Sequence, residues 1–248
     1  MEQPIVPFKI AAHGGAAGYA PENTLTSFQK GLELGANVLE VDVHLSKDGE
    51  LIVMHDATLE RTTDGSGYIH DHTLHDLKQL DAAAHIASSQ KEQIPTLGDV
   101  FDLARGKAKF DIDLKNGPRI YPGIEEQVVR TIEDYDLVND VMVISFTHLS
   151  LRQIKALNPH IQTGIVYNAG LLEPWVVAKT VNADALYPKY FYQIDDIILE
   201  AHRRGYPVYA WTIDTLDDMQ RWINYGVDGI TSNYPDLVRK VARDLSLV

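Results

Sequence analysis

The 248-residue chain carries 35 acidic against 22 basic side chains, and its formal charge of −13 would repel a nucleic-acid backbone, so no nucleic-acid partner is expected. Hydrophobic residues make up 45% of the chain, as in ordinary soluble globular proteins, and the lack of cysteine excludes disulfides and thiolate metal sites. The N-terminal residues lack the pattern of a signal peptide and no apolar run is long enough to span a membrane, so we expect a cytoplasmic protein without stable membrane insertion. The oligomeric state stays open.

Short apolar, β-branched runs alternate along the chain with segments of helical periodicity. In chain order, strands are expected at 8–13, 37–45, 109–115, 141–146, 163–167, 184–188, 207–212 and 228–232. Helices are expected at 23–34, 97–105, 123–135, 148–157, 172–180, 194–204, 215–224 and 235–244. Several helical segments end at a glycine that suits a left-handed cap, at positions 35, 106, 205 and 226. Eight such units predict a single (β/α)8 barrel in which residues 1–248 form one domain.

A long insertion, residues 46–95, separates the second expected strand from its helix. Within it, LSKDGELIVMH places a Lys-Asp-Gly turn between two apolar runs, which predicts a β-hairpin. Connections of this length are usually functional when they are ordered. In a barrel the insertion would lie at the carboxyl ends of the strands, where active sites are built.

Two expected strands carry acidic residues at alternate positions. Glu40 and Asp42 would share one face of the second strand, and Asp111 and Asp113 repeat the spacing in the third. An isolated pair of this kind is more often exposed to solvent, but apolar residues fill the positions between and favour the barrel interior. Buried carboxylates need neutralisation, which a hard divalent cation provides. We therefore expect Glu40, Asp42 and Asp113 to bind a metal ion and Asp111 to form hydrogen bonds deeper in the barrel.

Two histidines stand at strand ends facing the expected site. His13 ends the first strand and His55 ends the hairpin. A lone histidine is more often structural, but two imidazoles beside three strand-borne carboxylates suit general acid–base catalysis. Lys115, just beyond Asp113, could meet a phosphate oxygen or could equally be a surface lysine.

Taken together, the motifs resemble the glycerophosphodiester phosphodiesterase family. The matching pieces are His13 with Gly15, Pro21-Glu22-Asn23-Thr24, the run from Glu40 to Gly49, Val53-Met54-His55-Asp56, Leu59-Glu60-Arg61-Thr62-Thr63, Ile94-Pro95-Thr96-Leu97, Asp113-Leu114-Lys115, Ser145-Phe146 and Trp211-Thr212.

The resemblance implies a TIM barrel that hydrolyses glycerophosphodiesters to sn-glycerol 3-phosphate and an alcohol, with one bound Ca²⁺ or Mg²⁺. It implies metal ligation by Glu40, Asp42 and Asp113, acid–base catalysis by His13 and His55, and a phosphate contact from Lys115.

The chain departs from the family pattern at three places. Gly14 stands where the family usually has a phosphate-binding Arg, Asp113 where Glu is typical, and Ser232-Asn233 where Thr-Asp is more usual. Lys189, after the sixth expected strand, could replace the missing cation.

Alternatively, the metal, Lys115 and the backbone amides of Gly14 and Gly15 could suffice for the phosphate. Around the substrate, an aromatic groove could be lined by Trp211, Tyr187, Phe146 and Tyr19, although aromatic residues at strand ends also pack against loops.

Two other functions stay open. The missing Arg is compatible with a barrel that has lost turnover and acts as a binding or regulatory module. The second open function is that of a lysophospholipase D-type enzyme on the same scaffold, because a fold does not determine the substrate. We favour a small water-soluble diester as the substrate, with its head group and the choice between Ca²⁺ and Mg²⁺ undetermined.

Overall fold

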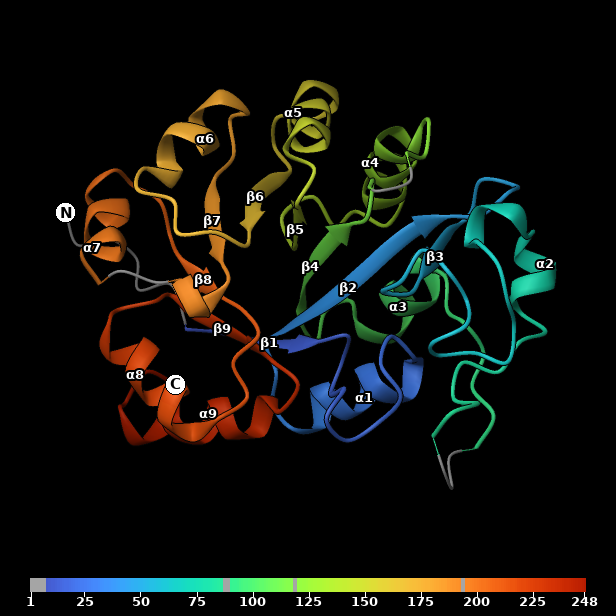
Figure 1. Cartoon of the computed structure of the whole chain (residues 1–248), viewed down its shortest axis with the longest axis horizontal. Helices are drawn as coiled ribbons and strands as arrows, with labels where there is room; N and C mark the ends of the chain where they lie inside the picture. Colours follow the sequence, from blue (N-terminus) through green and yellow to red (C-terminus); the bar gives the residue numbers. More distant parts are fainter. Residues whose placement is uncertain (1–7, 87–89, 118–119, 193–194) are drawn as a thin grey trace.

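A ring of eight parallel strands forms the centre of the protein, with helices around it (Figure 1). The computed structural model describes residues 8–86, 90–117, 120–192 and 195–248. Around the ring the strands follow the order β7-β6-β5-β4-β2-β1-β9-β8, and parallel bridges from Leu186 to Val208 and from Lys189 to Trp211 join β7 to β8. The barrel expected from the sequence is confirmed.

The strands lie close to their expected positions. They are β1 (Lys9–His13), β2 (Val38–Leu45), β4 (Lys109–Leu114), β5 (Val141–Ser145), β6 (Gln162–Tyr167), β7 (Ala185–Pro188), β8 (Tyr209–Ala210) and β9 (Gly229–Ser232). The helices of the outer layer are α1 (Leu25–Glu33), α3 (Leu97–Ala104), α4 (Ile124–Asp134), α5 (His148–Leu157), α6 (Pro174–Thr180), α7 (Asp195–Arg203), α8 (Leu216–Asn224) and α9 (Pro235–Asp244). A short 3-10 helix, η2 (Tyr190–Tyr192), follows β7.

Local sequence accounts for the ends of several helices. The side chain of Thr96 accepts a hydrogen bond from the Asp99 amide and the Asp99 carboxylate accepts one from the Thr96 amide, a reciprocal cap that starts α3. The four glycines expected at helix ends all have positive φ, between 76° and 90°. These caps explain why the repeat could be read from the sequence.

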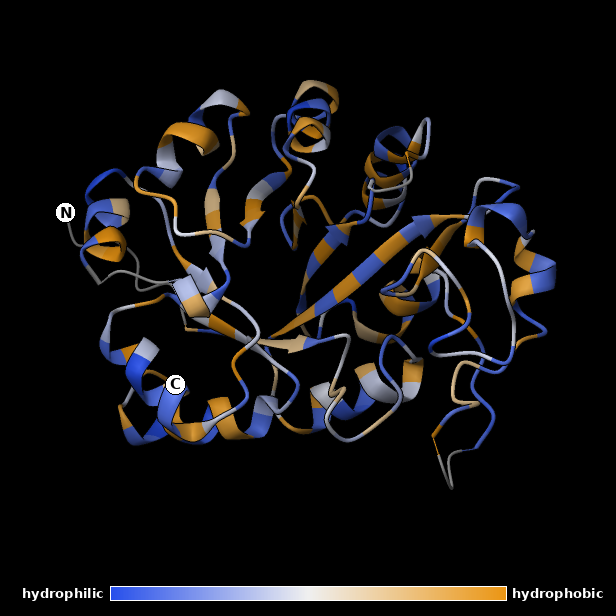
Figure 2. Cartoon of the chain, viewed as in Figure 1, coloured by the Kyte–Doolittle hydropathy of each residue, from blue (hydrophilic) through white to orange (hydrophobic). Residues whose placement is uncertain are grey.

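The two faces of the barrel wall are chemically different. Apolar side chains of β2, such as Leu39, Val41 and Val43, pack under the helices in the main hydrophobic core. Their neighbours Glu40 and Asp42 lie on the interior face, and Figure 2 shows this alternation as bands along β2. A smaller apolar cluster, including Met142, Ile144 and Tyr187, forms a second core separate from the main one.

Residues 46–86 and 90–95 lie to one side of the barrel (Figure 1). β3 (Leu51–Val53) pairs antiparallel with the end of β2, and η1 (Ile69–Asp71) and α2 (Leu74–Leu77) follow. A separate apolar cluster stabilises this segment, and it consists of Ile52, Met54, Leu59, Ile69, Leu77, Ala82 and Ile94. The hairpin places His55 beside the carboxyl end of β2. Among the described residues, no helix has the length and apolar character needed to cross a membrane.

Candidate active site

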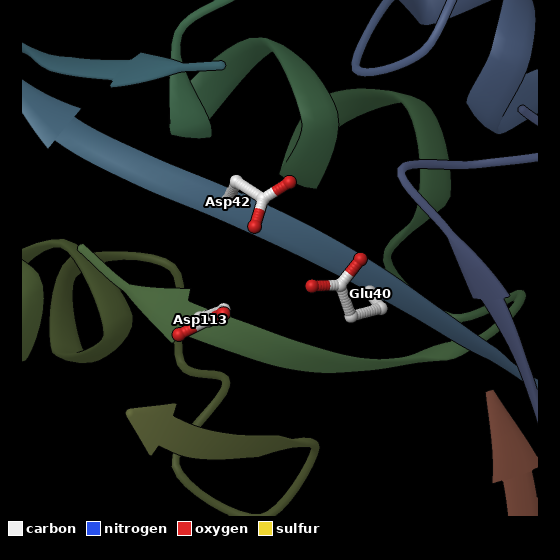
Figure 3. Close-up of side chains that lie close together, drawn as sticks. All are labelled: Glu40, Asp42 and Asp113. Atoms are coloured by element: carbon white, nitrogen blue, oxygen red, sulfur yellow. The ribbon is translucent and has the colours of Figure 1, made fainter. Parts of the chain in front are cut away.

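Three buried carboxylates converge at the carboxyl ends of β2 and β4. The strand register places Glu40 beside Asp111 and Asp42 beside Asp113. Glu40, Asp42 and Asp113 are each at most 5% exposed, and each offers an oxygen within 4.8 Å of the other two (Figure 3). The sequence prediction that these three side chains meet is therefore correct.

The donor set fits a hard divalent cation. The Gly14 amide donates to Glu40 Oε2 over 2.9 Å, and Asn23 Nδ2 donates to Asp42 Oδ2 over 2.7 Å. Two further oxygens, Asp42 Oδ1 and Asp113 Oδ1, are buried and accept no hydrogen bond among the described residues, although Asp42 Oδ1 lies within ion-pair distance of Lys115. Buried carboxylate oxygens without partners are costly, and Ca²⁺ and Mg²⁺ bind oxygen ligands of this kind. The cluster could thus hold a metal ion.

Lys115 supplies one positive charge to the cluster. Its ammonium lies 2.6 Å from Asp113 Oδ2, with hydrogen-bond geometry, and 2.8 Å from Asp42 Oδ1, where only the ion-pair distance is met. Burial would lower the pKa of Lys115, but the carboxylates of Asp113 and Asp42 outweigh it and raise the pKa above its ordinary value. Lys115 is therefore a cation, and with all three carboxylates ionised its charge would leave two negative charges unbalanced.

The pKa values of the three carboxylates shift by different amounts and in different directions. Burial, followed by the charge of Asp42, raises the pKa of Glu40 well above its ordinary value. Burial also raises the pKa of Asp113. For Asp42, burial would raise the pKa, but the adjacent Lys115 cation outweighs burial and lowers the pKa. Without a second cation, Glu40 is the carboxylate whose ionisation is most strongly opposed.

Asp111 has a different role, as the sequence indicated. Its carboxylate accepts hydrogen bonds from Lys9 Nζ over 2.9 Å and from Tyr187 Oη over 2.9 Å, deep in the barrel. Because this carboxylate has Lys9 as its own cation, it is separate from the cluster of Glu40, Asp42 and Asp113.

A cavity of about 250 Å³ opens beside Asp42. It is lined by His13, Gly14, Glu22, Asn23, Asp42, His55, Asp56 and Arg61. The two histidines come from different elements, β1 and the segment after β3. Each is held through its Nδ1 atom, His13 by Asn233 Oδ1 at 2.8 Å and His55 by Asp56 Oδ1 at 2.7 Å. In both rings this hydrogen bond therefore involves Nδ1 and not Nε2.

Comparisons with known proteins agree with this geometry. Residues 13–237 match the model of the glycerophosphoryl diester phosphodiesterase family. The chain belongs to that family.

Relatives match over nearly the full length of the chain. A glycerophosphodiester phosphodiesterase of Caldanaerobacter subterraneus is 40% identical over 236 residues, covering 94% of this chain and 97% of the relative. One from Bacillus subtilis is 33% identical, covering 94% and 85%. Among solved structures, an Oleispira antarctica phosphodiesterase in complex with the product sn-glycerol-3-phosphate superposes with a TM-score of 0.86 at 28% identity, covering 96% of this chain and 97% of that one.

Gly14, which stands where the family usually has an Arg, lies in a tightly packed turn. Gly14 has a φ of +51°, and its amide is already bound to Glu40. A Cβ there would lie 3.3 Å from Asn23 Nδ2 and 3.5 Å from Glu22 Cβ. Gly14 therefore orients a carboxylate, and its amide is not the free phosphate donor considered from the sequence.

Lys189 lies against aromatic rings at the end of β7. Its ammonium is 4.4 Å from the centre of the Trp211 ring and 5.4 Å from that of Phe191. Trp211 also contacts Phe146 edge to face, with 5.4 Å between ring centres. A cation and aromatic surface thus occupy the β7–β8 side of the mouth, across from the acidic side formed by β2 and β4.

Two aromatic residues considered for the groove, Tyr187 and Tyr19, have partners outside the cavity of the two histidines. Tyr187 is 1% exposed, and its hydroxyl accepts from Lys9 in the barrel interior. The Tyr19 hydroxyl donates to Asp236, and its ring packs on Tyr234. The prediction was wrong for Tyr187 because strand parity directs it inward, below the mouth.

The structure adds residues to which the sequence had given no role. Arg61 Nε donates to Asp56 Oδ2 over 2.6 Å and Arg61 Nη1 to Glu22 Oε2 over 3.0 Å. Behind His13, Asn233 is hydrogen-bonded to Asp214. Arg61 and Glu22 stood in the matching motifs and Asn233 in one of the departures from them, but only the fold shows which histidine each of them supports.

Proposed function

We propose that this protein hydrolyses glycerophosphodiesters to sn-glycerol 3-phosphate and an alcohol. The observation that supports this most directly is the arrangement of two histidines and an acidic metal-type cluster around one cavity, in a chain of this family. The names of the relatives and the product-bound Oleispira structure point to the same chemistry.

Glu40, Asp42 and Asp113 would hold one divalent cation, Ca²⁺ or Mg²⁺. When bound, such an ion would offset the charge of a phosphate oxygen and so lower the barrier to attack. Lys115, already held beside Asp42 and Asp113, would contribute a second positive charge at the phosphate. These charges are needed because the chain as a whole is strongly negative.

His13 and His55 would move protons on either side of the scissile bond. One removes a proton from the attacking hydroxyl and the other donates a proton to the departing alcohol. Both rings are fixed at Nδ1 by a side chain that does not line the metal cluster, which keeps Nε2 available.

The rest of the substrate would lie against the mouth of the barrel. Trp211 and Lys189 form one side, and Gly14 forms part of the cavity wall on the other. A phosphodiester keeps one negative charge at neutral pH, so Lys189 would partly replace the Arg that is absent at position 14.

A kinetic panel tests this function. The protein is assayed on glycerophosphocholine, glycerophosphoethanolamine and lysophosphatidylcholine, with release of sn-glycerol 3-phosphate as the readout for the diesters. We expect turnover of the two diesters, loss of turnover on exhaustive chelation, and a fall in kcat of roughly 10²–10⁴-fold for His13→Ala or His55→Ala. Lys189→Ala should reduce kcat/KM more than the remote control Lys240→Ala.

Each alternative predicts a different result. Turnover of lysophosphatidylcholine alone would indicate a lysophospholipase D-type enzyme. Metal-dependent binding of glycerophosphocholine without any turnover would indicate a binding module. Near-normal kcat for His55→Ala would remove that residue from the mechanism.

A further inference from the structure

The imidazole of His13 is supported by an amide rather than by a carboxylate. His13 Nδ1 lies 2.8 Å from Asn233 Oδ1, just after the end of β9. An amide side chain has an accepting oxygen and a donating nitrogen, so its orientation decides whether His13 Nδ1 donates or accepts. The tautomer of His13 therefore depends on what holds Asn233.

Asp214 holds that amide in one orientation. Asn233 Nδ2 donates to Asp214 Oδ2 over 2.7 Å, while the backbone amide of Asn233 and the hydroxyl of Ser232 both donate to Asp214 Oδ1 at 2.9 Å. An ionised carboxylate only accepts, so the NH₂ group of Asn233 faces Asp214 and its oxygen faces His13. His13 must then donate from Nδ1.

We propose that Asp214, acting through Asn233, is a positioning residue that keeps the proton of neutral His13 on Nδ1 and leaves Nε2 as the proton acceptor in the cavity. This rests on the proposed function. In the reaction, the attacking oxygen forms its bond to phosphorus as its proton passes to His13 Nε2. The bond from phosphorus to the departing oxygen breaks, and that oxygen receives a proton from His55. The other tautomer of His13, with its proton on Nε2, has no lone pair there and cannot accept.

The same geometry explains the unusual Ser232-Asn233 pair. A carboxylate at position 233 could accept from His13 without assistance. The amide of Asn233 has two possible orientations, and only its bond to Asp214 selects one. Ser232 adds a donor that fixes the Asp214 carboxylate, and its hydroxyl also accepts from the Tyr234 amide.

The variant Asp214→Asn should reverse the amide of Asn233. The oxygen of the new side chain stays with its two donors, the Asn233 amide and the Ser232 hydroxyl, so its NH₂ group faces the side chain of Asn233. Asn233 then rotates to offer its oxygen, and its NH₂ group turns toward His13 Nδ1. Because Nδ1 must now accept, the proton of His13 moves to Nε2. The exchange Asp214→Asn with Asn233→Asp restores an acceptor beside Nδ1.

The test combines kinetics with ¹⁵N NMR of the histidine rings in the full chain at saturating Ca²⁺ or Mg²⁺. Asp214→Asn should lower kcat roughly 10²–10⁴-fold, the range for loss of a proton acceptor or a wrong tautomer, with KM changed less than about threefold. Its His13 signals should shift from the Nδ1-protonated to the Nε2-protonated pattern. The double exchange should recover most of kcat and the original pattern. Asp217→Asn, at an exposed site three residues away, is the matched control.

Several outcomes would overturn the inference. The first is a kcat for Asp214→Asn equal to that of Asp217→Asn, and the second is a His13 tautomer that Asp214→Asn leaves unchanged. The third is a loss of kcat that the double variant, although folded, does not recover. If Asp214→Asn does not fold, Asn233→Ala serves instead and should give a mixture of tautomers. If the wild-type protein hydrolyses no diester, the proposed function fails, while the NMR measurement still decides the tautomer.

Discussion

The residues of the site are held largely by partners far away in the sequence. His44 shows how strongly burial among such partners can shift the pKa of one side chain. It lies on the interior face of β2, two residues after Asp42 and 2% exposed, with Nδ1 at 2.9 Å from Tyr121 Oη and Nε2 at 3.1 Å from the His55 carbonyl. Burial lowers the pKa of His44 from 6.5 to about 4. His44 is thus neutral in the folded protein, and its bonds to Tyr121 and to the His55 carbonyl support the segment that carries His55.

The shifted pKa of His44 predicts a loss of stability in acid. The unfolded chain takes up a proton near pH 6.5 and the folded protein only near pH 4, so stability falls as the pH drops between these values and is unaffected above them. The contribution reaches about 2 kcal/mol at pH 5. Urea unfolding with chelator at pH 7 and pH 5 measures it. His44→Gln should reduce the difference in unfolding free energy between pH 7 and pH 5 by about that amount, and the exposed control His160→Gln should leave it unchanged. An equal pH difference in the two variants would contradict the role given to His44.

At the scale of elements, the insertion is joined to the barrel by an ion-pair network at the cavity. Arg61 connects the segment after β3 to the loop before α1 through Asp56 and Glu22. Hydrogen bonds from Arg61, ahead of other causes, lower the pKa of Asp56. Asp56 in turn accepts from His55, so Arg61 acts on the histidine through Asp56.

Replacing Arg61 should impair catalysis more than folding. In Arg61→Met the carboxylates of Asp56 and Glu22 lose their shared cation and repel each other, so His55 loses its fixed orientation. Small misplacements of this kind cost about 10²-fold in rate, and we expect a fall in kcat of roughly 10- to 100-fold. Because Arg61 is 46% exposed, the loss in stability should be small. Arg203→Met, which breaks a pair between Arg203 and Glu200 on α7, is the control; equal kcat in both variants would rule out the role of Arg61.

Element positions and carboxylate convergence were predictable because both follow from local sequence. Strand parity placed Glu40 and Asp42 inside the barrel, and the glycines at positions 35, 106, 205 and 226 marked where helices end. Contacts between distant residues were not predictable in this way. The pair of His13 and Asn233 spans 220 positions, and nothing in the local sequence indicates it. Strand parity predicts which face of the barrel wall a side chain lies on, but not how deep along the barrel axis it lies. Tyr187 was therefore wrongly assigned to the groove.

For the whole molecule, we propose that the chain unfolds as one domain. Ile52, in the apolar cluster of the insertion, lies on β3, and β3 is hydrogen-bonded to β2 of the barrel. The long segment is thus continuous with the central sheet, and its loss would expose the end of the strand that carries Glu40 and Asp42. A ligand bound to these carboxylates should consequently stabilise the insertion and the barrel together.

Metal binding should therefore shift a single unfolding transition. A cation at about 100 times its Kd adds about 2.7 kcal/mol, which for a chain of this size raises Tm by about 5–10 °C. Differential scanning calorimetry of chelated protein, with and without added Ca²⁺ or Mg²⁺, measures the shift. Glu40→Gln keeps an acceptor for the Gly14 amide but lacks the charge, so it should lose most of the shift, whereas Glu50→Gln, exposed in the turn before β3, should keep it. A Tm that neither ion changes in the wild-type protein would contradict the metal site, and two separate transitions would contradict the single domain.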